Sequence, residues 1–103
     1  MKRFSENYEL RIASKARKQI KKLPSKIQKA IDQELDIIIS NPEIGELKHD
    51  DLAGIRIHKF KPPSHKEEIL IGYEIYDKVI AILTIGHHER YYNRLKIYLR
   101  TQR

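Results

Sequence analysis

Two clusters of histidine, arginine and tyrosine contain the residues of this chain best suited to chemistry. In the segment Ile55–Lys61, Arg56 and His58 alternate with isoleucines, and in Gly86–Tyr92 two histidines precede two tyrosines. Histidine has an ordinary pKa close to neutral pH, so it can serve as a general acid or base. Arginine and lysine can stabilise charge on a phosphate, and tyrosine can stack on a base.

These residue types together could cleave a phosphodiester bond without a metal ion. A base would accept the proton of the ribose 2′-hydroxyl, cations would hold the charge that builds on the phosphate, and an acid would protonate the leaving 5′-oxygen. The sequence has no glycine-rich phosphate loop, nucleophile elbow or Ser/His/Asp arrangement, and its histidines and carboxylates show no recognised metal-ligand spacing.

Both clusters also have a structural explanation. Arg56 and His58 could be ordinary solvated charges on a sheet face that is incompletely covered. Adjacent side chains do not converge on a helix or a strand, so one of the two histidines could be structural. Residue types alone therefore do not decide between a functional site and an ordinary solvated surface.

The hydrophobic pattern predicts the elements that hold these clusters. Polar and apolar residues alternate over Tyr8–Ile12, as in a half-buried strand, and apolar residues then recur every three or four positions over Ala13–Leu23. This second segment is predicted to be an amphipathic helix with a basic outer face. Pro24 breaks the pattern, and another helix runs on to Asn41-Pro42. The short link predicts an antiparallel helical hairpin.

The second half of the chain is predicted to supply the rest of a sheet and one more helix. Ser25 and Gln28 resemble a capping box at the start of the second helix. After a loop with a turn at Gly54, three strands are predicted: Ile55–Lys61, Glu68–Tyr76 and Val79–Ile85. The last two are almost continuously apolar, so both of their faces should be covered. Gly86 is expected to end the sheet, and helical spacing follows it.

Length and charge restrict the class of protein. The chain has 103 residues, which fits one domain over 1–103, and 21 Lys and Arg against 14 Asp and Glu give it a net charge of +7. This excess favours a polyanionic partner, which could be nucleic acid, an anionic membrane surface or an acidic protein. There is no cysteine, no apolar signal segment and no apolar run long enough to span a bilayer. We expect a cytoplasmic protein.

The order of these elements and several short motifs together resemble the RelE/ParE superfamily of toxins from type II toxin–antitoxin systems. The resemblance covers nearly the whole chain, and it depends on the order and spacing of the motifs more than on any one of them. The motifs are Leu23-Pro24, Asn41-Pro42, Leu52–His58, Ile69–Ile75, and Gly86–Glu89 followed by Tyr92 and Leu95. The resemblance implies an α+β fold with a small, mainly antiparallel sheet in the order β-α-α-β-β-β-α. A two-helix hairpin would cover one face, and the active or binding surface would lie on the other.

The family resemblance also implies a function. RelE-like members cleave mRNA on the ribosome without metal, ParE-like members inhibit DNA gyrase, and both are neutralised by a cognate antitoxin. We therefore expect a toxin that is a metal-independent endoribonuclease, needs no cofactor and inhibits translation. Its partners would be mRNA, the ribosome and an antitoxin. A gyrase-inhibiting toxin without nuclease activity and a non-enzymatic nucleic-acid-binding module are the alternatives.

The resemblance assigns catalytic roles to four residues. Arg56 and His58 stand where ribonuclease members carry basic residues on the central strand. His88, two positions after Gly86, matches a histidine that some members use as acid or base. Tyr92 stands where those members carry an aromatic residue close to the reacting phosphate.

Neighbouring residues are expected to bind the substrate, and one family feature is missing. Leu70 stands where many RelE-like toxins carry an arginine, and Glu67 or Glu68 lies near the position of an acidic residue. The residues expected to bind substrate are Lys59, Lys61, His87 and Arg90, and no residue is assigned to a metal.

Overall fold

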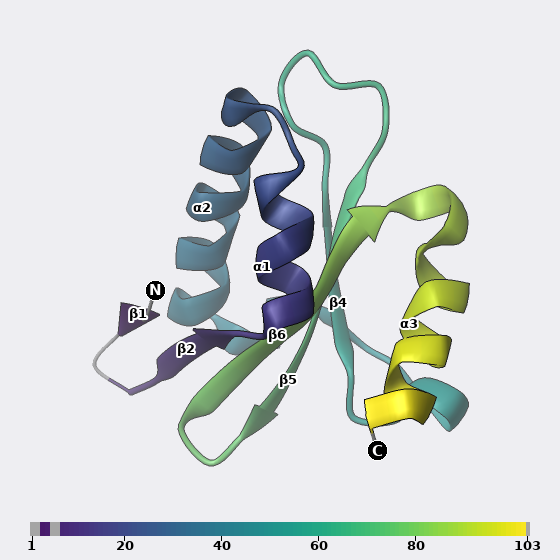
Figure 1. Ribbon diagram of the computed structural model, residues 1–103. Helices are drawn as coiled ribbons and strands as arrows, with labels where there is room; N and C mark the ends of the chain where they lie inside the picture. Colours follow the sequence, from purple (N-terminus) through teal and green to yellow (C-terminus); the bar gives the residue numbers. More distant parts are fainter. Residues whose placement is uncertain (1–2, 5–6, 103) are drawn as a thin grey trace.

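The computed structural model describes residues 3–4 and 7–102, and the side chains of residues 7–87 and 91–101. Its strands are β1 (Arg3–Phe4), β2 (Glu9–Ile12), β3 (Glu46–Leu47), β4 (Arg56–Phe60), β5 (Ile69–Tyr76) and β6 (Val79–His87). Its helices are α1 (Ser14–Lys21), α2 (Ser25–Ser40) and α3 (His88–Gln102), with short 3-10 helices at Pro42–Ile44 and Asp50–Leu52. Figure 1 shows α1 and α2 together on one face of the sheet and α3 on the other. Within the described residues, no helix is long and apolar enough to cross a membrane.

The strands form one sheet in the order β1-β2-β6-β5-β4-β3. All neighbouring pairs are antiparallel except β2 and β6, which run parallel with Leu10 beside Ile80. The predicted α+β class with a mainly antiparallel sheet is confirmed. Two details differ: the sheet gains the two-residue edge strands β1 and β3, and Gly86 does not end β6. Gly86 pairs with Leu70 and His87 pairs with Ile69, so β6 is longer than expected.

Each face of the sheet has its own hydrophobic core. Ile69 and Ile71 of β5 point toward the α1–α2 hairpin, where they meet Ile31 and other buried residues of that layer. Leu70, between them, points to α3 and packs with Leu95. The alternation of a strand places successive side chains on opposite faces, so a continuously apolar strand serves both cores. The prediction that β5 and β6 are covered on both faces is confirmed.

The hairpin forms as predicted, but its second helix does not begin with a capping box. Pro24 is the N-cap, Ser25 is the first helical residue, and no side chain caps this end. Gln28 instead donates from Nε2 to the carbonyl oxygen of Leu23 at 2.8 Å, which ties α2 to the link before it. The helix ends before Asn41, as proline at the next position requires.

The loop after α2 is fixed to the sheet by two polar side chains. The hydroxyl of Tyr73 donates to the carbonyl of Pro42 at 2.6 Å and accepts from the amide of Gly45 at 2.9 Å. A Cβ atom at Gly45 would lie only 2.7 Å from that hydroxyl, so this close approach requires glycine. Arg56 donates from Nη1 to the carbonyls of Gly45 at 2.8 Å and Glu43 at 3.2 Å.

Candidate functional site

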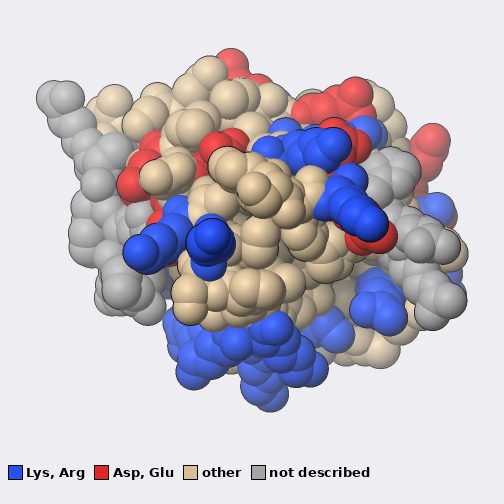
Figure 2. Space-filling view, turned by 90° about the horizontal axis from the view of Figure 1, so that it is seen from above, with Lys and Arg blue, Asp and Glu red and all other residues tan. Residues whose placement is uncertain are grey.

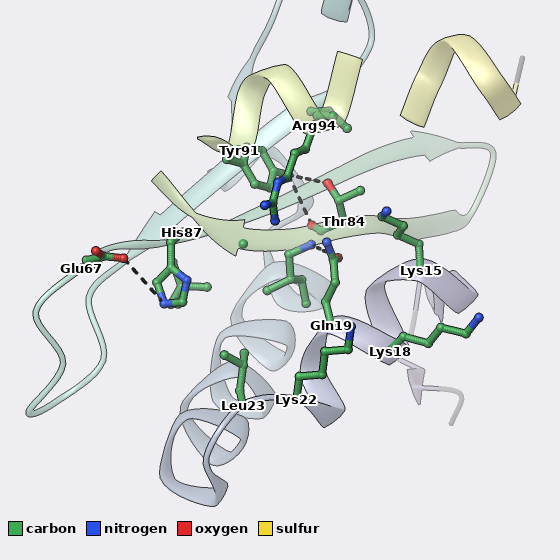
Figure 3. Close-up of a pocket in the computed structure, with 14 residues that line it drawn as sticks. Lys15, Lys18, Gln19, Lys22, Leu23, Glu67, Thr84, His87, Tyr91 and Arg94 are labelled. Carbon is green, nitrogen blue, oxygen red and sulfur yellow. Dashed lines mark hydrogen bonds and ion pairs between the residues drawn. The ribbon is translucent and has the colours of Figure 1, made fainter. Parts of the chain in front are cut away.

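A cleft of about 520 Å³ lies between α1 and α3, beside the end of β6 (Figure 3). β2 pairs with β6 only as far as Ile82, because the chain then turns into α1. From there α1 borders β6, and Oε1 of Gln19 accepts a hydrogen bond from the Ile85 amide at 2.8 Å. Beside the cleft, the edge of β6 is therefore hydrogen-bonded by a helix side chain instead of by a neighbouring strand. We call it the α1–α3 cleft.

Of the described side chains, four cationic ones line the α1–α3 cleft. Lys15, Lys18 and Lys22 come from α1, at the spacing of three and four that shares one helix face, and Arg94 comes from α3. In Figure 3, Arg94 and Lys15 extend toward β6 from opposite sides. Among the side chains that the structure describes, Glu67 is the one carboxylate in the lining. This concentration of positive charge in a concave site attracts anions.

His87 lines the cleft where β6 ends, and it contacts a second histidine, His65, which is not one of the lining residues. Nε2 of His65 and Nε2 of His87 are 3.0 Å apart, and the two rings are tilted by 32° with centroids 5.1 Å apart. At this distance one nitrogen carries a hydrogen and the other offers its lone pair. Oε2 of Glu67 lies 3.9 Å from Nε2 of His87. The side chain of His87 is 37% exposed, so an anion in the cleft can reach it.

Tyr91 forms a wall of the cleft and fastens α3 to β6. Its hydroxyl lies 2.8 Å from Oγ1 of Thr84 and donates to the Thr84 carbonyl at 3.3 Å. Burial raises the pKa of Tyr91 well above its ordinary value, so the phenol is neutral at physiological pH. Gly72 has no side chain, and the Tyr91 hydroxyl fills that space. The geometry gives Tyr91 a supporting role rather than a chemical one.

Arg56 and His58 lie on the opposite face of the sheet from α3. Nε2 of His58 is 2.7 Å from Oε1 of Glu34 on α2, while Ile57 between them belongs to the α3 core. Arg56 binds the carbonyls of the loop after α2. Their strand is not central either, because β4 lies between β5 and the two-residue β3. Both residues thus lie on the face of the sheet that the α1–α2 hairpin covers, away from the α1–α3 cleft.

The other predicted residues with described side chains are also dispersed. Tyr92 packs at the margin of the α3 core, and Nζ of Lys48 lies 5.4 Å from its ring centroid. Lys59 is exposed on β4, and Lys61 is exposed just beyond that strand. Of the predicted site residues, the structure brings His87 alone into the cleft lining, among the side chains it describes.

The remaining two predicted residues, His88 and Arg90, have side chains outside the described set. The backbone of His88 begins α3 and directly follows His87 at the end of β6. Its role stays a prediction, as do the roles assigned to the other residues of the predicted site.

Sequence reasoning missed most of the cleft. The basic face of α1 was recognised, and the spacing of Lys15, Lys18 and Lys22 was the signal that one side of α1 could line a site. His65 carried no such signal, because it lies in a loop 22 residues before the histidine that it contacts. Arg94 was likewise one polar residue among several on α3.

Solved structures of RelE-type toxins have the same fold. A double mutant of E. coli RelE in the free state aligns with a TM-score of 0.68 and 18% identity, covering 88% of this chain and 94% of that one. The toxin–antitoxin complex RelBE2 from Mycobacterium tuberculosis gives 0.66 and 22%, covering 80% and 99%. The intact E. coli RelBE complex gives 0.62 and 20%, covering 79% and 96%. At these identities the likeness establishes the class of fold.

A family model shows the family itself. The model described as the ParE-like toxin of type II bacterial toxin–antitoxin systems matches residues 10–96. This chain therefore belongs to that toxin family, within the RelE/ParE superfamily that the motifs indicated. A comparison with curated proteins found no match.

Proposed function

We propose that this toxin is a metal-independent endoribonuclease that cleaves ribosome-bound mRNA and so inhibits translation. The observation that carries the proposal is the contact between His65 and His87 at 3.0 Å, at the end of a cleft lined by four cations. RNA cleavage through the 2′-hydroxyl needs one base, one acid and a stabilised phosphate. The cleft and the adjoining His65 together offer all three types of group.

The histidine pair supplies the proton transfers in this proposal. In this proposal one ring enters neutral and acts as the base, and the other enters as the imidazolium and acts as the acid. The 2′-oxygen attacks the phosphorus as its proton passes to the base, and the bond to the 5′-oxygen breaks as the acid protonates it. The attacking and leaving oxygens lie on opposite sides of the phosphorus, so the two rings must part to admit the phosphate. In this proposal His65, which lies in a loop, is the ring that moves.

The cations hold the substrate strand. Lys15 and Lys22 on one wall and Arg94 on the other can neutralise the charge that builds on the phosphate oxygens. Arg56 and His58 support the fold in this proposal, since each already has partners near it. His88 stays a candidate because it follows His87 directly, and Lys59, Lys61, Arg90 and Tyr92 are candidates for contacts outside the cleft.

The test compares variants in bacteria, with mRNA 5′ ends mapped after induction. His87→Ala and His65→Ala should each lower cleavage by about 10²–10⁴-fold, the usual contribution of a general acid or base. His49→Ala is the matched control, because His49 is exposed and is not part of the cleft lining. His88→Ala completes the series. Circular dichroism of each purified variant checks that it is folded.

Each outcome decides between functions. Growth arrest with new mRNA ends that disappear in the His65 and His87 variants would support the nuclease. Cleavage that survives both substitutions, or that His49→Ala abolishes equally, would refute the assigned pair. No arrest at all would favour a non-enzymatic nucleic-acid-binding module.

A second candidate is a ParE-like toxin that inhibits DNA gyrase without nuclease activity. The family model favours it, and so does Leu70, which is completely buried under α3 where a phosphate-binding arginine would be expected. α3 also exposes Ile97 by 58% beside Lys96, as a helix that contacts a protein would. Inhibition of supercoiling by the purified toxin, unchanged in His87→Ala, would establish this function instead.

We also propose a cognate antitoxin as partner. Two of the similar structures are toxin–antitoxin complexes, and a toxin of this family needs neutralisation to be tolerated. Co-expression with the short reading frame next to the toxin gene should prevent growth arrest and yield a complex that purifies together. Harmless, soluble expression of the toxin alone would count against both the toxicity and the antitoxin.

A further inference from the structure

The contact between His65 and His87 results from where two strands begin and end. β5 begins at Ile69, and Ile69 pairs with His87 at the end of β6. The loop before β5 therefore lies beside the end of β6. In that loop the amide of His65 donates to the carbonyl of Pro62 at 3.2 Å, and Ser64 has a positive φ of 61°. This tight turn holds the backbone of His65 opposite His87.

Two imidazole nitrogens this close can be joined by a metal ion as well as by a hydrogen. Nε2 of His65 and Nε2 of His87 are 3.0 Å apart. Nitrogens that share one tetrahedral Zn²⁺ lie about 3.3–3.4 Å apart, because each Zn–N bond is about 2.0–2.1 Å long. A small movement and reorientation of the rings would therefore let both lone pairs reach one ion. Spacing along the chain could not indicate this pair, because its members are 22 positions apart.

A carboxylate beside the two histidines favours a cation there. Oε2 of Glu67 lies 3.9 Å from Nε2 of His87, and the Glu67 side chain is 56% exposed, so it can turn toward an ion. In Figure 3, Glu67 and His87 lie together at one end of the cleft, whereas Lys15 and Lys18 lie toward the other end. The negative charge of Glu67 thus acts locally on the histidine pair.

Positive charge elsewhere opposes a bound cation. Figure 2 shows Lys and Arg side chains gathered along the lower edge of the molecule, and Lys22 and Arg94 line the cleft. Because like charges repel, Zn²⁺ should need the charge of Glu67 as well as the two nitrogens. Within the described side chains, no group of three potential ligands is already arranged to hold a metal ion. We therefore expect weaker binding than at a structural zinc site with four protein ligands.

We propose that His65 and His87, assisted by Glu67, bind a divalent transition-metal ion of the Zn²⁺ type, and that this ion inhibits the toxin. Imidazole nitrogen is a preferred ligand of zinc, whereas Mg²⁺ prefers oxygen. The ion would occupy the lone pairs of both Nε2 atoms, and water would complete its coordination. The inhibitory role rests on the nuclease function proposed above, because a nitrogen bound to zinc can neither accept nor deliver a proton.

Isothermal titration calorimetry with ZnCl₂ tests the site without reference to cleavage. The wild type should bind one Zn²⁺ per chain and give no signal with MgCl₂. Loss of an outer partner of a metal ligand weakens binding by about 10–100-fold, so Glu67→Gln should lose about that much and His65→Ala and His87→Ala at least as much. His49→Ala is the control, because His49 is exposed and does not belong to the pair. Circular dichroism checks that each variant is folded.

A second measurement follows cleavage of ribosome-bound mRNA by the purified wild type as ZnCl₂ is added. Zinc at concentrations that fill the site should abolish cleavage, and a zinc-selective chelator that leaves ribosomal Mg²⁺ in place should restore it. The zinc concentration that gives half inhibition should be higher for Glu67→Gln by the same factor as its dissociation constant. This comparison separates zinc at the histidine pair from zinc acting on the ribosome.

Binding of one ion that requires both histidines would establish the site even if the protein cleaves no RNA, so failure of the nuclease function is distinguishable from failure of the site. Equal zinc affinity of the wild type and the His65 and His87 variants would overturn the site, as would an equal loss in His49→Ala. Cleavage that zinc stimulates, or that zinc inhibits equally in the wild type and in Glu67→Gln, would overturn the inhibitory role.

Discussion

His58 shows at the scale of one residue why a polar side chain on a strand is ambiguous in sequence. Its alternation with isoleucines suggested an exposed site, but its side chain is only 11% exposed and its ring meets Glu34 of α2 at 2.7 Å. The two residues are 24 positions apart, and Glu34 has no distinguishing neighbours in sequence. Only the docking of α2 on the sheet creates the pair. The same docking makes His58 a structural residue in our interpretation.

Glu34→Ala should destabilise the protein by about 1–3 kcal/mol, because it leaves a largely buried imidazole without its partner. Gln33→Ala is the control, since Gln33 is exposed on the same helix and its loss should change stability by less than about 0.5 kcal/mol. Urea unfolding followed by circular dichroism measures both. Equal stability of the two variants would show that the contact contributes nothing and would reopen a functional role for His58.

At the scale of elements, most of the fold could be predicted from the sequence and most of the candidate site could not. The hairpin, the three long strands and α3 each have a strong hydrophobic period that can be recognised from the sequence alone. β1 and β3 are two residues long, too short for any period, and exist because a neighbouring strand offers hydrogen-bonding groups. The α1–α3 cleft depends on how many residues of β6 pair with β2. Tertiary packing sets that number, so the local sequence pattern does not reveal it. His87 could be named as a candidate from sequence because it lies at the end of a strand, whereas His65 becomes a candidate only through its tertiary contact with His87.

The attachment of α3 to β6 through Tyr91 predicts loss of stability at high pH. Burial keeps Tyr91 protonated in the folded protein, whereas in the unfolded chain it ionises near its ordinary value of about 10. Above that pH the unfolded state binds fewer protons than the folded state, so stability falls as pH rises, by up to about 1.4 kcal/mol per pH unit. Below it, the contribution is fully present. Tyr73, whose pKa burial also raises, contributes with the same sign.

Urea midpoints of the wild type and Tyr91→Phe between about pH 9 and pH 11 measure this effect. The variant should start less stable, because Thr84 loses its partner, and should then decline less steeply than the wild type. Tyr76→Phe is the control, since Tyr76 is 54% exposed. Parallel curves for the wild type and Tyr91→Phe would contradict the assignment.

At the scale of the whole molecule, two cores share one set of strands. β5 sends Ile69 and Ile71 to the hairpin core and Leu70 to the α3 core, and β6 divides its residues similarly. Because the two cores share β5 and β6, neither core can unfold while these strands stay paired in the sheet. The cleft inherits this coupling, because one of its walls belongs to each layer. The α1–α3 cleft therefore exists only while both cores are intact.

Ile31→Ala in the hairpin core and Leu95→Ala in the α3 core, each at a fully buried residue, should each cost about 2–5 kcal/mol. Because the strands couple the cores, each variant should still unfold in one transition, with circular dichroism and tyrosine fluorescence coinciding. The substitutions are on opposite faces, so the double variant should show the sum of the two costs within about 0.5 kcal/mol, if it folds. Ile97→Ala, at an exposed position of α3, should leave the midpoint unchanged. An early separate transition of α3 in Leu95→Ala would show that the α3 wall of the cleft can open independently, and the two layers would then have to be treated as separate folding units.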